Sequence, residues 1–262
     1  MVKKLKRKNH ITGKLKNNNM KYFIDTEFLE GTQKRGWFGR KTTKPTIDLI
    51  SIGIVCEDGR KYYAICNEFN FDEAWNRYDQ QDEKSPKVYW IRANVLINVW
   101  LDFVGGIHKS YLYPFTYENV KRIFKENGRS KAQIANDICA FIYGDDCGGS
   151  GMSAIEMATK YEPAKEEMKP EFYAYYSAYD WVAFCWIFGK MKDLPKGFPM
   201  YCNDLKQMLD QKADKTYTHT QSFDKKIQCI KDLPYFPKNK NEHHALSDAE
   251  FDFELYKFLQ NI

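Results

Sequence analysis

The pattern of hydrophobic and polar residues predicts three strands near the start of the chain. Residues 21–28 begin apolar and then place acids at alternating positions, which is typical of a buried strand that reaches a sheet edge. Two further apolar runs, 48–56 and 61–66, flank the turn-forming residues 57–60 and suit a hairpin. These runs predict an antiparallel meander, with a basic, Gly- and Thr-rich loop over 31–46 between its first two strands.

The later part of the chain alternates extended and helical patterns. Residues 171–179 predict a second buried strand, and the apolar residues 181–188 predict a helix that follows directly and ends at Gly189. Residues 243–259 repeat apolar positions at steps of three or four, so one face of a final helix should pack on the sheet. The other predicted elements are helices over 71–78, 86–100, 130–143 and 204–210, a short strand over 200–202 and a long polar connection over 216–241.

A flexible arm is expected to precede a single folded domain, 20–262. Residues 1–19 contain seven Lys or Arg, no acid and no apolar periodicity. The arm either attaches the protein to nucleic acid or is a solvated leader, and the second interpretation is favoured. The Gly-rich residues 145–153 lack the Gly-Lys-Ser/Thr of a phosphate loop, so they predict a plain loop.

Composition narrows the class of protein. The 262 residues are 43% hydrophobic and 29% charged, which describes a globular protein rather than a disordered one. The net charge of +5 comes from the arm, because 33 basic and 35 acidic residues remain without it. Seven cysteines form no Cys-x-x-Cys pair, and no secretory signal or membrane-spanning run is visible, so a cytoplasmic protein with free thiols is expected.

Four acids stand at positions that suit a common site. Asp25 and Glu27 are two residues apart on a strand, so their side chains project from the same face. Asp180 is the only charge in an apolar tract, at the junction where a strand gives way to a helix. Asp248 lies near the start of the last helix, with His243 five residues before it. We expect the four acids to meet.

The negative charge of four carboxylates that meet must be compensated, because like charges raise one another's pKa. Ligation by oxygen alone favours Mg²⁺ or Mn²⁺, and two such ions could stabilise the attacking and leaving oxygens of a phosphodiester displacement. His243 would then deprotonate water. A zinc site is disfavoured because His10, His108 and His219 are isolated and no Cys/His group has ligand spacing.

Three blocks of sequence, in this order, resemble a known family. Residues 25–28, 177–181 and 243–249 resemble the three motifs of the DEDD exonucleases of the ribonuclease H-like superfamily, in the branch with a catalytic histidine. The narrower likeness is to the exoribonuclease AS-type proteins, over 22–28, 48–55, 58–64, 193–195 and 199–200. The resemblance implies a ribonuclease H-like α/β fold with a central mixed five-stranded sheet flanked by helices. Inserts without a clear family counterpart lie near 31–46, 101–130, 145–170 and 214–241.

The resemblance also implies a role for each residue of the site. Asp25 would bridge two metal ions, Glu27 and Asp248 would complete one metal site, and Asp180 would hold the other ion. His243 would be the general base, while His244 has the spacing used by the tyrosine-dependent branch and stays an alternative. The residues expected to bind substrate are Phe28, Leu29, Tyr176 and Tyr179, with core packing as the alternative for Phe28 and Leu29.

The function expected from these residues is metal-dependent 3′ to 5′ exonuclease activity on the 3′ ends of nucleic acid, with RNA preferred over DNA. One alternative is an endonuclease that uses the same site, because the inserts could leave the cleft open at both ends. A second is a non-catalytic nucleic-acid adaptor that uses the basic arm. The oligomeric state is open, and a homodimer is one alternative.

Overall fold

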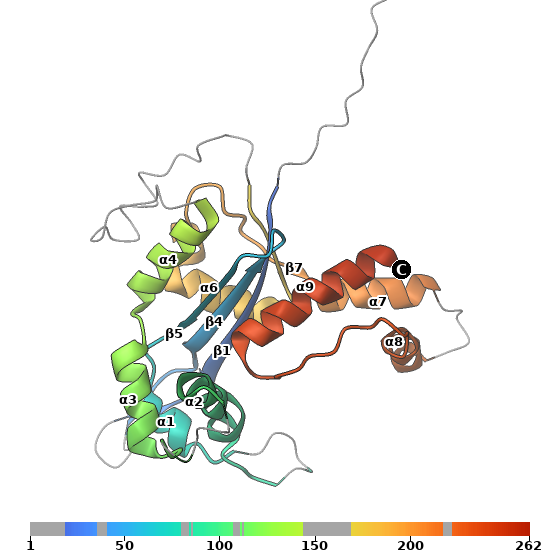
Figure 1. The fold of residues 1–262 in the computed structure, drawn as a ribbon. Helices are drawn as coiled ribbons and strands as arrows, with labels where there is room; N and C mark the ends of the chain where they lie inside the picture. The colour runs from blue at the N-terminus through green and yellow to red at the C-terminus, as the bar shows by residue number, and fades with distance from the viewer. Residues whose placement is uncertain are drawn as a thin grey trace, which may run out of the picture.

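A mixed sheet of five strands forms the centre of the protein in the computed structural model (Figure 1). The structure describes residues 19–35, 41–79, 84, 86–106, 111, 113–143, 169–216 and 222–262. The strand order is β5-β4-β1-β6-β7. The strands are β1 (Lys21–Gly31), β4 (Thr46–Cys56), β5 (Lys61–Ile65), β6 (Glu171–Ala174) and β7 (Asn203–Asp204).

The pairing within this sheet confirms the predicted fold. β1, β4 and β5 form an antiparallel meander, whereas β6 and β7 run parallel to β1. Two parallel strands need a crossover, and α6 (Ala178–Phe188) connects β6 to β7 in this way. A mixed sheet of this order, flanked by helices, is consistent with the ribonuclease H-like fold that the sequence predicts.

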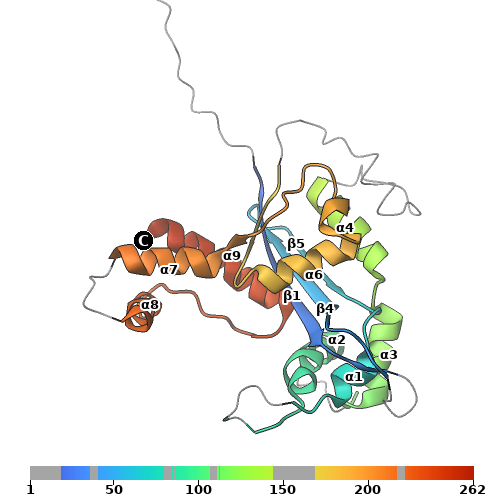
Figure 2. The same cartoon turned by 180° about the vertical axis from the view of Figure 1, so that it is seen from behind.

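Alternation along β1 divides the core between the two faces of the sheet. Tyr22 and Ile24 pack with α6 and α4 (Lys131–Tyr143), whereas Phe23 packs on the opposite face. The helices on that opposite face are α7 (Leu205–Thr216), α8 (Phe223–Lys231) and α9 (Ala245–Asn261). Figures 1 and 2 show α6 and α9 on the two sides of the sheet.

A third apolar cluster forms a lobe beyond the end of β1. It gathers Leu29 and Ile50 with α1 (Phe71–Asn76), a π-helical turn (Arg92–Leu96), α2 (Ile97–Val104) and α3 (Tyr117–Asn127). The labels in Figure 1 place α1, α2 and α3 together at this end of the sheet. The insert expected near 101–130 therefore contributes a packed helix, α3, to the lobe.

Several predicted boundaries are wrong. The connection expected over 216–241 contains α8, whose apolar residues Ile227 and Ile230 face the core. The short strand expected over 200–202 lies one step later, as β7, and α7 continues to Thr216 rather than ending at residue 210. The loop expected over 31–46 includes the two-residue strands β2 (Lys34–Arg35) and β3 (Lys41–Thr42).

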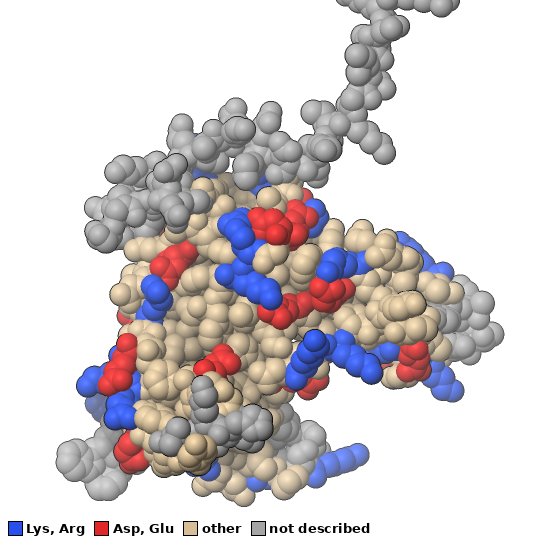
Figure 3. Space-filling view, viewed as in Figure 1, with Lys and Arg blue, Asp and Glu red and all other residues tan. Residues whose placement is uncertain are grey.

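Some expectations fall outside the described residues. They concern residues 1–18 of the basic arm, the Gly-rich stretch 145–153, and the isolated His10, His108 and His219. In the part of the chain that the structure describes, no helix has the length and apolar character needed to cross a membrane. Basic and acidic side chains are interspersed over the face drawn in Figure 3, in keeping with the near balance of charge outside the arm.

Candidate active site

The alternation of β1 places Asp25 and Glu27 on the face of the sheet that α9 covers. Phe23, two residues before Asp25, contacts the rings of Phe253 and Tyr256 of α9. Thr26 points to the other face, where it meets α6 through Asp180. The two carboxylates therefore project side by side from one strand, as their spacing predicts.

Gly53 lets the first turn of α9 lie directly on the sheet. This residue pairs with Asp25 in the register between β1 and β4. A Cβ atom at Gly53 would lie 2.3 Å from the carbonyl oxygen of Ala245 and 2.4 Å from the Cα atom of Leu246. Because no side chain intervenes, the start of α9 can approach close enough to bring Asp248 to Asp25.

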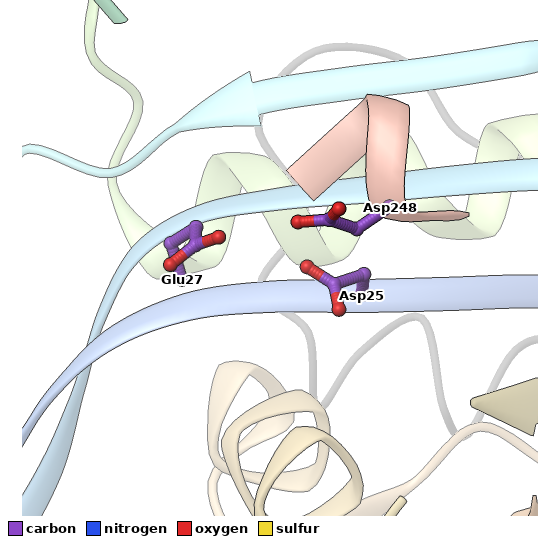
Figure 4. Close-up of side chains that lie close together, drawn as sticks. All are labelled: Asp25, Glu27 and Asp248. Carbon is purple, nitrogen blue, oxygen red and sulfur yellow. The ribbon is translucent and has the colours of Figure 1, made fainter. Parts of the chain in front are cut away.

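Three carboxylates converge as a result. One oxygen each of Asp25, Glu27 and Asp248 lie within 4.8 Å of one another. Figure 4 shows Asp25 and Glu27 projecting from β1 and Asp248 reaching toward them from the first turn of α9. The expected meeting of acids from distant parts of the sequence is present for these three.

Asp180 is held beside this group by Thr26. Its Oδ1 atom accepts hydrogen bonds from the backbone N–H of Thr26 at 2.9 Å and from the Thr26 hydroxyl at 2.7 Å. Asp180 is buried, with 7% of its surface exposed. Its charge still reaches the cluster, because it contributes to raising the pKa values of both Asp25 and Glu27.

Burial raises the pKa values of all four acids, and repulsion by neighbouring carboxylates adds to the rise for Asp25, Glu27 and Asp180. Burial is the largest cause for Asp25 and Glu27, and the negative charges of neighbouring carboxylates raise their pKa values further, well above the ordinary range. Burial also raises the pKa of Asp248, against the opposing effect of a hydrogen bond from Asn239. Burial raises the pKa of Asp180 to about 6, although the hydrogen bonds from Thr26 lower it.

This donor set fits a divalent cation. Its ligand atoms are carboxylate oxygens, which hard cations such as Mg²⁺ and Mn²⁺ prefer. Among the described residues, none of the ion pairs with Lys or Arg includes Asp25, Glu27, Asp180 or Asp248. The described part of the chain thus gathers four acids here without a Lys or Arg partner for them.

The two adjacent histidines have different surroundings. His243 lines a cleft of about 460 Å³ together with Asp25 and Asp248, and its ring meets the indole of Trp90 edge to face at 4.7 Å between centroids. His244 is buried and caps α9, because its Nδ1 atom accepts a hydrogen bond from the backbone N–H of Ser247 at 3.3 Å. Its other ring nitrogen bonds Asp102 at 2.5 Å. Of the two, His243 faces the cleft.

Two polar residues of the site were missed by sequence reasoning. The Asn239 amide donates a hydrogen bond to Asp248, yet it lies in an irregular stretch with no periodic signal. Asp252 is buried on α9, where it accepts a hydrogen bond from the Tyr175 amide at 3.0 Å, and burial raises its pKa well above the ordinary value. A signal for Asp252 was present, because it follows Asp248 by four residues and so shares its helix face.

The residues expected to bind substrate divide into two groups. Phe28 is half-buried and stacks on Tyr179 at 5.8 Å between centroids, while Tyr179 is 52% exposed and Tyr176 is 62% exposed. Leu29 is fully buried in the lobe with α1 and α2. Its side chain therefore offers no surface to a substrate, and the core-packing alternative holds for this residue.

The fold and the acidic cluster together define a class of protein. A ribonuclease H-like sheet whose first strand carries two carboxylates, joined by a third from the last helix, is consistent with a DEDD-type exonuclease.

Comparison with known proteins points to the same class. No family model matches the sequence. Two curated relatives, from the CDC 1551 / Oshkosh and H37Rv strains of Mycobacterium tuberculosis, are each named 3′-5′ exoribonuclease. Each is 28% identical to this chain over 240 residues, which span 92% of this chain and 93% of the relative. These relatives confirm the resemblance that the three motifs suggest.

Proposed function

We propose that this protein is a metal-dependent 3′ to 5′ exonuclease that hydrolyses phosphodiester bonds, with RNA as its preferred substrate. The observation that carries the proposal is the convergence of Asp25, Glu27 and Asp248 from β1 and α9 beside the buried Asp180. The 3′-5′ exoribonuclease activity in the names of the two relatives supports both the direction and the choice of RNA.

The four acids would hold two divalent ions, Mg²⁺ or Mn²⁺. Asp25 is central to the cluster and would contact both ions, while Glu27 and Asp248 would complete one site. Asp180 would serve the other through Oδ2, because its Oδ1 atom already accepts two hydrogen bonds from Thr26. Bound ions would offset the repulsion among the carboxylates and stabilise negative charge on the attacking and leaving oxygens of the phosphate.

His243 would act as the general base. Its imidazole lines the same cleft as Asp25 and Asp248, and it would accept the proton that the attacking water loses as the new phosphorus–oxygen bond forms. His244 is a poor alternative because its ring is committed to Ser247 and Asp102.

The exposed aromatic rings beside the site would receive the terminal bases. Phe28 follows the Asp25–Glu27 pair on β1 and stacks on Tyr179, which leaves the exposed part of the Tyr179 ring for a base. Tyr176 is also exposed, and the ammonium group of Lys206 lies 5.8 Å from its ring centroid. The Lys206 ammonium group also pairs with Asp210 of the same helix, and it would suit a phosphate of the bound strand.

Hydrolysis of end-labelled nucleic acid tests this proposal. We expect the purified protein with Mg²⁺ or Mn²⁺ to shorten 5′-labelled single-stranded RNA from its 3′ end, giving a ladder, and to leave circular RNA intact. Chelator should abolish the reaction. Asp25→Asn should remove most activity, while Asp224→Asn, an exposed acid in the first turn of α8, should not.

The same assay separates the alternatives. Cleavage of circular RNA would favour the endonuclease, and RNA binding without turnover would favour the adaptor. His243→Ala should lower the rate by about 10²- to 10⁴-fold, the usual contribution of a general base. If Asp25→Asn left turnover unchanged, the catalytic interpretation of the acidic cluster would be wrong.

A further inference from the structure

Four side chains at four-residue steps run along the helix that precedes α3. They are Trp90, Asn94, Asn98 and Asp102, and they begin before the π-helical turn and end within α2. In an α-helix, positions four apart drift by about 40° per step, so a long row of this kind winds off one face. The wider π-helical turn between Trp90 and Asn98 changes that drift. Three of the four side chains contact residues 242–244.

Asn98 holds the backbone at His243 by donating hydrogen bonds to the carbonyl oxygens of Glu242 and His243. It is buried, with 8% of its surface exposed, and its side-chain N–H groups lie 3.0 Å from the carbonyl oxygens of both Glu242 and His243. The same amide reaches the carbonyl oxygen of Asn94 at 2.8 Å. A single buried side chain thus links α2 to two successive carbonyls of the segment that carries the proposed base.

Asp102 holds His244, the residue that follows His243. The Nδ1 atom of His244 accepts a hydrogen bond from the Ser247 amide, which leaves the ring hydrogen on Nε2. That N–H donates to Asp102 at 2.5 Å. The His244 ring also stacks on Tyr63 of β5 at 4.7 Å between centroids. The start of α9, and with it Asp248, is therefore joined to α2 through His244.

His243 itself has a backbone conformation that needs such support. Its φ angle is +65°, in the left-handed region, and among described residues other than glycine only Tyr176 shares a positive φ. A side chain with a Cβ atom keeps this conformation when surrounding contacts fix it. The indole of Trp90 then meets the imidazole ring itself.

We propose that Asn98 and Asp102 are positioning residues for His243. They act through the backbone of residues 242–244, so that the imidazole projects into the cleft beside Asp25 and Asp248. Neither residue touches the substrate. The proposal rests on the proposed role of His243 as general base, and it makes the α2 segment part of the machinery of the site.

Steady-state kinetics on RNA with saturating Mg²⁺ provide the first test. Loss of two hydrogen bonds to the His243 segment should lower kcat by about 10- to 100-fold in Asn98→Ala, with KM changed by less than about twofold. Asn127→Ala is the control, because the exposed Asn127 donates to the carbonyl oxygen of Ile123 within its own helix, α3. Asp102→Ala should lower kcat in the same way, and its 52% exposed side chain makes a folding defect an inadequate explanation.

A double-mutant cycle separates positioning from general damage. In a His243→Ala background, Asn98→Ala should change the remaining rate by less than about twofold, because the group that it positions is already gone. An undiminished effect in that background would overturn the proposal.

Amide hydrogen exchange tests the contact without relying on activity. In Asn98→Ala, exchange of the amides of residues 242–247 should be about tenfold faster or more, with no change in Asn127→Ala. Unchanged exchange would overturn the proposal even if the enzyme degrades RNA. A different result is faster exchange in Asn98→Ala together with full activity in His243→Ala. It would support the role of Asn98 in holding residues 242–244 and refute the role of His243 as general base.

Discussion

Replacing Asp180 by asparagine should stabilise the metal-free protein near neutral pH. The pKa of Asp180 is raised from 3.8 to about 6, chiefly by burial. Asparagine keeps an oxygen at Oδ1 that can accept both hydrogen bonds from Thr26, but it carries no charge. The substitution thus removes the buried charge while leaving the acceptor in place.

The sign and size of this change in stability follow from proton linkage. Between pH 3.8 and 6 the folded protein holds a proton on Asp180 that the unfolded chain has released. The contribution of Asp180 to the free energy of unfolding is therefore fully present below pH 3.8 and is lost as the pH rises through 6. A difference of about two pH units corresponds to about 3 kcal/mol in total, of which roughly half is lost between pH 5 and 7.5.

Urea unfolding in chelator, near pH 5 and near pH 7.5, measures this difference. We expect the wild type to lose stability relative to Asp180→Asn as the pH rises, by about 1 kcal/mol, and Asp224→Asn to follow the wild type. Saturating Mg²⁺ at the higher pH should stabilise the wild type more than Asp180→Asn. Equal pH dependence in the wild type and Asp180→Asn, or a less stable variant near pH 7.5, would refute the electrostatic reasoning.

Two further substitutions test the geometry of the site. Gly53→Ala should displace the start of α9, because its Cβ atom would lie 2.3 Å from the backbone of Ala245. Calorimetry should then show weaker Mg²⁺ binding. Unchanged Mg²⁺ affinity would contradict the importance of this close approach. Phe28→Ala should remove the stack on Tyr179 and raise KM for RNA, with little change in Mg²⁺ affinity. An unaltered KM would show that Phe28 packs in the fold and does not bind substrate.

The parts of the site that could be predicted from sequence rest on short-range rules. Strand alternation placed Asp25 and Glu27 on one face, and a lone acid in an apolar tract identified Asp180 as a buried group with a partner. That partner, Thr26, was not predicted, because the contact joins residues 154 positions apart. Local periodicity says which face a side chain occupies, but not which distant residue it meets there.

Leu29 and the row formed by Trp90, Asn94, Asn98 and Asp102 show where prediction from sequence fell short. Leu29 shares a strand face with Asp25 and Glu27, yet the lobe of inserted helices covers that face one step later. The four-residue spacing from Trp90 to Asp102 was visible in the sequence, but its meaning depends on where residues 242–244 lie. Asn239 contacts Asp248 from an irregular stretch, for which sequence periodicity offers no guide.

The most direct test of the account is equilibrium binding of Mn²⁺, followed by electron paramagnetic resonance, to the wild type and to Asp25→Asn. We predict that the wild type binds two ions and that Asp25→Asn, which lacks the carboxylate shared between them, loses at least one while remaining folded. Equal numbers of bound ions and equal affinities in the two proteins would contradict it.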